Sequence, residues 1–364
     1  MQNWQLLEVR SNASPEDLRE AWLDLTTRSA FAAGLSRPEL LAPLARVTPG
    51  IDLHAIFAED SLLLALPIQT RGLPPTYTSW VTPLTPGGAP HLDREQGAAA
   101  FAALLRKLDR PLLLRGIPLD GPLMEALTAS GEHLRVIERW QRSVLRPQGS
   151  FESWVAASLG KKRCGEFRRL KSRLAERGRL EVAELRAGAD AAPFAKALLD
   201  LEAAGWKGQR GTAIKSQPRV AAAFPEICAS LHAAGALRFW QLSLDGRVLA
   251  SLYAIVEGGC AWLGKIAYDE NFSKYSPGVL VLLEATERLF AEPGLRLADS
   301  CAIPNHPMMD NIWRDRQAIG DVLVAGPAIS RMRFAALAAA ETTRRKARGL
   351  ARDLYYRVSG KSRS

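Results

Sequence analysis

The sequence predicts a mixed α/β fold built from two units and followed by a basic helical tail. The chain has 364 residues, which is too long for one ordinary hydrophobic core and suits two domains with an extension. Hydrophobic residues make up 47% of the chain, a share typical of a globular protein. Short apolar runs bounded by turn residues alternate with longer helical patterns. This alternation predicts helices packed against a mixed β-sheet.

The Pro147-Gln148-Gly149 turn is the expected domain boundary, because proline and glycine interrupt regular structure there. We therefore place the first domain at residues 1–147, the second at 150–325 and the tail at 326–364.

The first domain is expected to be a complete α/β unit. A helix should begin at Ser14, since serine is a good N-cap and Pro15 suits the first helical position. Residues 71–90 are rich in Pro, Gly and Thr and predict a loop, because proline interrupts strand pairing. The other predicted elements are strands at 4–9, 53–57, 61–67, 111–114 and 136–145, and helices at 96–108 and 121–130.

The second domain begins with two helices that meet at Gly160. The first is capped by Ser150, and the second, at 162–177, carries an apolar stripe among arginines and lysines. Asp245-Gly246 predicts a type I′ turn between two strands. The remaining predictions are strands at 180–185, 236–244, 248–256, 260–268, 295–301 and 319–324, helices at 193–204, 220–234 and 308–316, and a polar loop at 205–211.

The stretch from Cys260 to Phe290 is the candidate ligand-binding element. It predicts a strand, a polar turn and a helix, with Tyr275-Ser276-Pro277-Gly278 as the hinge. Pro277 suits the first turn of a helix, and Gly278 allows backbone N–H groups to approach a ligand. A helix N-terminus with free N–H groups favours anions. The alternative is an ordinary strand–loop–helix connection.

The net charge of +10 is concentrated in two segments. Residues 158–179 hold nine Lys/Arg against two Glu, a net of +7, and residues 325–364 hold ten against two, a net of +8. The remainder is therefore about −5, by subtraction of 15 from 10. This pattern favours local contact with an anionic partner, and solvated helix faces are the alternative for each segment.

Targeting and metal-binding signals are missing from the sequence. No N-terminal apolar core or long apolar run predicts a signal peptide or a membrane span. The four cysteines are scattered without a CxxC pair, so we expect free thiols and no metal site. We expect a cytoplasmic protein, with contact to the inner face of the membrane through the tail as an open alternative.

The element order and several motifs resemble the GNAT acyltransferase superfamily, and within it the CelD/BcsL-type acetyltransferase domain, a relative of the Fem-type aminoacyl transferases. The motifs are Gly205-Trp206-Lys207-Gly208, the hairpin sequence at 244–250, and Tyr268-Asp269 followed by the 275–278 hinge. The resemblance covers residues 153–324, and the layout of the first domain resembles a degenerate second GNAT-like unit. The resemblance thus implies tandem GNAT-like units.

This resemblance implies an acyltransferase that uses acetyl-CoA or another acyl-CoA on an amine or hydroxyl. The donor would lie on Tyr268, Tyr275, Ser276, Pro277 and Gly278, where ordinary members have a glycine-rich loop. The acceptor would be a small molecule or a glycan or lipid precursor, as in envelope polysaccharide synthesis. Because Fem-type relatives use aminoacyl-tRNA, a tRNA donor is an alternative, and so is a non-catalytic module. The oligomeric state is left open.

Direct acyl transfer needs a base for the acceptor and donors for the thioester carbonyl. His306 is the candidate base, with Asp299 or Asp310 orienting it. The alternatives are an exposed loop histidine and a first-turn helix acid. The expected acceptor-side residues are Trp206, Lys207, Arg210 and Trp313, with Trp206 as a core residue at a helix end the alternative.

Overall fold

The computed structural model describes residues 4–10, 18–72, 74–131 and 133–359. The strands are β1 (Trp4–Arg10), β2 (Asp52–Ala58), β3 (Ser61–Arg71), β4 (Thr76–Ser79), β5 (His91–Leu92), β6 (Leu112–Pro118), β7 (His133–Leu145), β8 (Leu180–Glu184), β9 (Leu237–Leu244), β10 (Arg247–Glu257), β11 (Cys260–Tyr268), β12 (Leu297–Asp299) and β13 (Asp315–Ala325). The α-helices are α1 (Arg19–Arg28), α2 (Pro38–Val47), α3 (Gly97–Lys107), α4 (Pro122–Ser130), α5 (Phe151–Ala175), α6 (Ala192–Ala204), α7 (Trp206–Gln209), α8 (Pro218–Ala233), α9 (Pro277–Phe290), α10 (Met309–Ile312) and α11 (Arg331–Ser359).

The strands of the described chain join into one sheet in the order β1-β2-β3-β4-β6-β13-β7-β12-β11-β10-β9-β8, with β5 pairing beside β3. The last strand, β13, lies between β6 and β7 and is antiparallel to both. β7 in turn pairs with β12. The sheet therefore runs without a break across the expected boundary at 147, and its last strand ends at the expected boundary at 325. The division into domains stays a prediction. The mixed α/β class with a C-terminal helix is confirmed.

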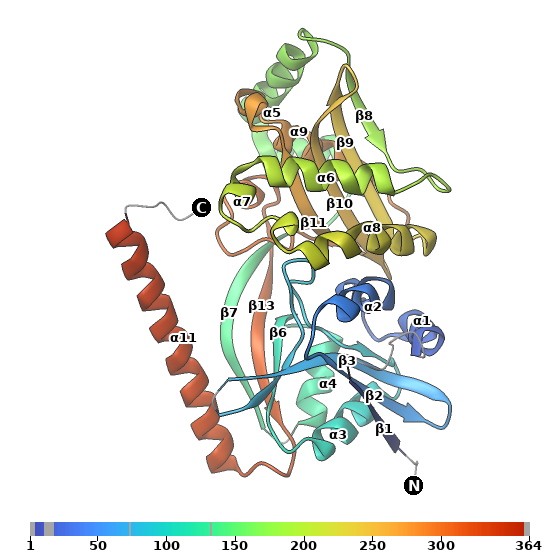
Figure 1. Cartoon of the computed structure of the whole chain (residues 1–364), viewed down its shortest axis with the longest axis vertical. Helices are drawn as coiled ribbons and strands as arrows, with labels where there is room; N and C mark the ends of the chain where they lie inside the picture. Colours follow the sequence, from blue (N-terminus) through green and yellow to red (C-terminus); the bar gives the residue numbers. More distant parts are fainter. Residues whose placement is uncertain (1–3, 11–17, 73, 132, 360–364) are drawn as a thin grey trace.

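Helices cover both faces of the second unit's strands. Phe239 and Tyr253 point into a core with α6 and α8, whereas their neighbours Trp240 and Leu252 point into a core with α9 and α5. This alternation follows from the two-residue period of a strand. Figure 1 shows α6 and α8 in front of β9 and β10, and α9 behind them.

Most predicted elements of the chain are present, and two local predictions held at the level of single residues. Gly160 has φ 70° and ψ 162°, so two helices meet there within α5. Asp245 and Gly246 have φ 48° and 79°, the left-handed pair that a type I′ turn requires. The expected helix start at Ser14 and Pro15 lies outside the described residues.

The prediction of a loop throughout 71–90 was wrong in one part. β4 pairs in parallel with β6 and antiparallel to β3. The prolines flank its four residues instead of interrupting them, so the ladder is not blocked. Similarly, the segment predicted as a polar loop at 205–211 contains the single helical turn α7. The sequence analysis did not predict α2.

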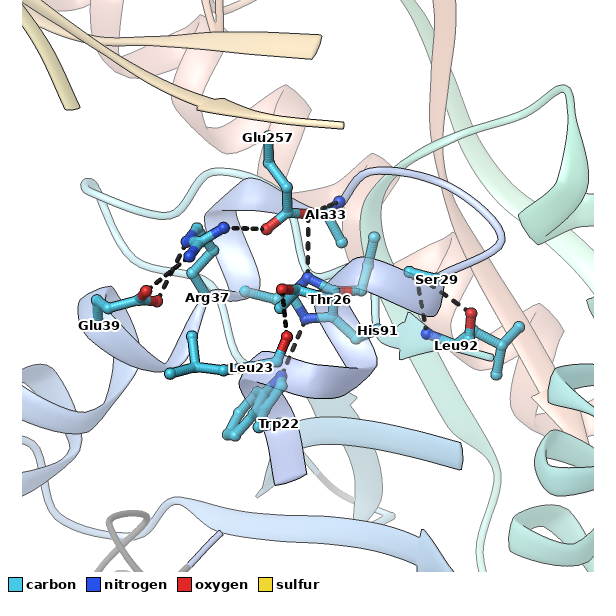
Figure 2. Close-up of polar contacts among 12 residues, drawn as sticks. Trp22, Leu23, Thr26, Ser29, Ala33, Arg37, Glu39, His91, Leu92 and Glu257 are labelled. Carbon is cyan, nitrogen blue, oxygen red and sulfur yellow. Dashed lines mark hydrogen bonds and ion pairs between the residues drawn. The ribbon is translucent and has the colours of Figure 1, made fainter. Parts of the chain in front are cut away.

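A buried polar network around Glu257 connects the two units (Figure 2). The Glu257 carboxylate, at the end of β10, accepts hydrogen bonds from the Ala33 N–H at 2.8 Å and the Arg37 guanidinium at 2.9 Å, and its Oε1 lies 3.1 Å from His91 Nε2. The Trp22 indole donates to His91 Nδ1 at 3.0 Å. Burial alone would raise the pKa of Glu257, but these partners hold it below its ordinary value.

α11 packs back on the first unit along its N-terminal half. Its Phe334 is buried with a ring centroid 5.3 Å from that of His133, and Arg345 bonds Asp321 on β13 at 2.6 Å. Figure 1 shows α11 running beside β7 and β13. Further along, Leu350 is 72% exposed. None of the described helices is long and apolar enough to cross a membrane.

Candidate acyltransfer site

The end of β11 and the start of α9 form the hinge predicted from the sequence. Ser276 has the left-handed conformation (φ 52°, ψ 50°), and no side chain caps the helix N-terminus that follows. Pro277 and Gly278 are buried, and a Cβ added to Gly278 would lie 3.1 Å from Cδ1 of Tyr268. Tyr268 therefore packs against the first turn of α9, and a larger residue at position 278 would have to displace its ring.

An open cleft of about 540 Å³ lies beside this hinge. Tyr268, Asp269 and Glu270 line it from the end of β11, and Gly205 and Gln209 line it from the α6–α7 turn. The two sides are joined directly, because the Trp206 N–H donates to Glu270 Oε1 at 2.7 Å. Arg247 and Val248 line it from the hairpin, so the cleft brings together residues of all three sequence motifs that carry the resemblance.

The predicted acceptor-side residues Trp206, Lys207 and Arg210 lie in and just after α7, and the first two border a small pocket that shares Tyr268 and Glu270 with this cleft. Trp206 is 39% exposed, and the Arg210 guanidinium lies 5.0 Å from its ring centroid. Lys207 points inward instead, where its Nζ donates to the Ile266 carbonyl at 3.0 Å. Trp206 is therefore not a buried core residue in this chain.

A buried carboxylate, which the sequence analysis did not identify, lies beneath Lys207. Glu202 is fully buried, and its Oε1 lies 3.3 Å from Lys207 Nζ and 3.4 Å from Lys265 Nζ. Its Oε2 accepts the Ile214 N–H at 2.8 Å. Burial lowers the pKa of Lys207, and the Lys265 charge lowers it further, against the opposing effect of Glu202. A glutamate within the apolar run LLDLEAA was the available signal.

His306 lies in the loop between β12 and α10. Its Nδ1 accepts the Met309 N–H at 3.3 Å, which leaves the proton of the neutral ring on Nε2. Burial lowers the pKa of His306, and the charge of Lys207 lowers it too, whereas Asp310 raises it. The ring is therefore predominantly neutral at pH 7, and its pKa depends on the charges of both Lys207 and Asp310.

The two aspartates predicted beside His306 have different surroundings. Asp310 accepts a hydrogen bond from Ser143 and influences His306 electrostatically. Asp299 instead bonds Arg142 on β7 at 3.0 Å through Oδ2 and the Cys301 N–H at 2.7 Å through Oδ1. Both carboxylate oxygens of the buried Asp299 are thus bonded to groups other than His306.

The last two predicted residues, Trp313 and Tyr275, are in the core. Trp313 is fully buried and donates from its indole to Thr286 on α9 at 3.1 Å. Tyr275 is buried beside Phe272. Both side chains belong to the core that α9 packs into, so a ligand could contact them only if that core opened. Within the described residues no cluster of His, Cys, Asp or Glu could hold a metal ion.

Comparisons with known proteins agree with this geometry. Residues 160–305 match the family described as "Acetyltransferase (GNAT) domain". This segment is therefore similar to GNAT acetyltransferase domains, and the predicted resemblance to that superfamily is confirmed. It holds α6, α7, β9–β11, the hinge and α9. A comparison with curated proteins gave no match.

Solved structures share the fold across both units. One is the C-terminal domain (DUF2156) of an Agrobacterium fabrum protein named as a lysylphosphatidylglycerol synthetase, with a TM-score of 0.57, 14% identity, and coverage of 91% of this chain and 96% of that one. FemX gives 0.56 at 11% identity, over 88% and 96% of the two chains. L-PGS from Bacillus licheniformis gives 0.53 at 10% identity, over 88% and 96%. At these identities the likeness establishes the fold alone.

Proposed function

We propose that this protein transfers an acyl group from an acyl-CoA, with acetyl-CoA as the expected donor, to an amine or hydroxyl. The acceptor would be a small molecule or a glycan or lipid precursor of the cell envelope, as in polysaccharide synthesis. The observation that carries the proposal is the uncapped N-terminus of α9, with Gly278 beneath Tyr268, at the edge of a 540 Å³ cleft.

The hinge suits the anionic part of a CoA donor. The first-turn N–H groups of a helix and its positive dipole end favour a pyrophosphate. The exposed Lys274 lies two residues before the hinge serine and adds a positive charge. Gly278 adds no side chain between Tyr268 and the first turn of α9.

The chemistry requires one proton transfer and one displacement. The acceptor nitrogen or oxygen attacks the thioester carbonyl carbon, the new bond forms, and the C–S bond breaks to release the CoA thiolate, which is then protonated. In the proposal the neutral His306 takes the acceptor proton at Nδ1, the nitrogen without hydrogen, and gives up its 3.3 Å contact with Met309. The Lys207 charge favours this neutral form because it lowers the pKa of His306.

Calorimetric titration with acetyl-CoA tests the donor. We expect saturable binding that Gly278→Val weakens at least tenfold, since a Cβ at 3.1 Å from Tyr268 forces that ring to move. The matched control is Gly349→Val on α11, where an added Cβ meets nothing within 4 Å and the backbone φ is not positive. Binding unchanged by the hinge substitution would contradict the assigned donor site.

Aminoacyl transfer from tRNA is the second candidate, favoured by the basic face of α5. Lys161, Arg168 and Lys171 border a groove of about 620 Å³ between α5 and α9. Within the described part of the chain, Lys171 alone of these three forms a salt bridge, to Glu284. Heat released on adding charged tRNA, with none from acetyl-CoA, would assign this function instead. Binding of acetyl-CoA without product on a broad acceptor panel would support a non-catalytic module.

A further inference from the structure

A second cavity lies between the two units, separate from the acyltransfer cleft. It has a volume of about 320 Å³, the share of roughly ten water molecules in the liquid. Loops of the first unit around residues 31–36, 87–89 and 116–123 form one side, and the starts of β11 and β12 form the other. Trp262 lines it and is six residues before Tyr268 on β11, so the two sites are about 20 Å apart along the strand.

One wall of this cavity contains an incompletely satisfied arginine. Arg142 is only 5% exposed, and its Nη1 donates to Asp299 at 3.0 Å. Its Nε is buried and has no hydrogen-bond partner among the described residues. Gln317, which lies opposite Arg142 in the β7–β13 register, lines the same cavity. A buried donor without a partner is costly, so it marks a place where a ligand oxygen would be stabilised.

The rest of the lining sets the chemistry of that ligand. Ala33, Leu35, Ala261 and Leu297 present apolar surface. The charge of Arg142 is already balanced by Asp299, and an exposed aspartate, Asp120, lies at the rim. An anion would therefore gain little, whereas a neutral carbonyl oxygen could accept from the guanidinium while its hydrocarbon part covers the apolar wall.

We propose that this inter-unit cavity binds a neutral, largely apolar molecule or acyl group through a carbonyl oxygen that accepts a hydrogen bond from Arg142. The site goes beyond the proposed acyl transfer, because it is distant from the hinge and needs no CoA. It also gives the first unit a ligand-binding function at its contact with the GNAT domain.

Calorimetric titration of the full chain with octanamide, in the absence of acetyl-CoA, tests this site. Octanamide combines a neutral carbonyl with a hydrocarbon chain, and octanoate is the matched anion. We expect saturable octanamide binding, with octanoate at least tenfold weaker because of the two aspartates. No heat from octanamide, or equal affinity for the two compounds, would overturn the proposal.

Three variants assign the binding to this cavity. Arg142→Lys keeps a charge for Asp299 but removes the Nε donor, and should weaken octanamide binding about tenfold. Ala89→Leu adds an isopropyl group to the lining and should reduce binding at least tenfold. Ala233→Leu makes the same change at an exposed position of α8 and should bind as the unaltered chain does. Circular dichroism and thermal melting confirm that each variant is folded, and wild-type affinity in both cavity variants would overturn the assignment.

Discussion

The Glu257 network predicts a large and specific loss of stability when its central charge is removed. Glu257→Gln keeps the shape of the side chain but leaves the amide NH₂ facing Arg37 or His91 (Figure 2). Both are donors, because Nδ1 of His91 accepts from Trp22 and Nε2 of the neutral ring therefore carries the proton. One charge-assisted hydrogen bond is lost, at a cost of about 1.5–3 kcal/mol. Glu257→Ala removes the shared acceptor of Arg37, His91 and the Ala33 N–H, although Arg37 keeps its pairing with Glu39. Each buried donor left without an acceptor costs about 1–3 kcal/mol, so this variant should lose more than about 3 kcal/mol.

Urea unfolding, followed by circular dichroism and tryptophan fluorescence, measures these losses. The matched control is Glu226→Gln, whose partner is Arg46 in a pair with both side chains about half exposed. Exposed pairs contribute less than about 1 kcal/mol, so this variant should unfold almost as the unaltered chain does. A loss at Glu257→Gln no larger than at Glu226→Gln would refute the argument that burial sets the magnitude.

The pH dependence provides a second check on the same network. The pKa of Glu257 is lowered in the folded protein, so its ionisation contributes stability above the ordinary carboxyl value of 4.5. That contribution is lost as the pH falls through the lower, folded value. The difference in stability between the unaltered chain and Glu257→Gln should therefore be full at pH 7 and shrink below about pH 4.5. A difference that stays constant down to pH 3 would show that the charge is not responsible.

Three further outcomes concern the proposed activity. The midpoint of the acid limb of kcat/KM against pH should lie below the ordinary histidine pKa of 6.5, because burial lowers the pKa of His306. Lys207→Met should move this midpoint upward, because it removes a positive charge that lowers the same pKa. An unchanged midpoint would exclude this coupling. His306→Ala should lower transfer by about 10²-fold with donor affinity intact, and unchanged turnover would leave it a loop residue. Deletion after Ala340 should weaken sedimentation with anionic vesicles, and equal sedimentation would reject membrane contact through the tail.

Local sequence chemistry determined the turns and helix boundaries that frame the candidate site. Gly160 and Asp245-Gly246 occupy left-handed conformations that few other residues adopt readily, so their positions identified a helix junction and a hairpin turn. Pro277 identified the first turn of α9, because proline has a helical φ and its missing N–H is not needed at the first helical position. The hinge and its tyrosine could thus be located from residues a few positions apart.

The partners of the polar residues could not be found this way. Asp299 is 157 residues from Arg142 along the chain and is paired with it only because β12 lies beside β7. Glu202 is placed beneath Lys265 by the packing of α6 against β11, and Lys207 reaches it from the turn that follows α6.

The sequence by itself determined that this chain has GNAT-like strand and helix order, where the hinge is, and which residues favour turns. Only the tertiary structure decided that β13 completes the first unit's half of the sheet, which residues neutralise the buried charges, and that a cavity lies between the units. The physical reason is that turn conformations depend on steric limits of neighbouring residues, whereas strand neighbours depend on which apolar faces the whole chain can bury together.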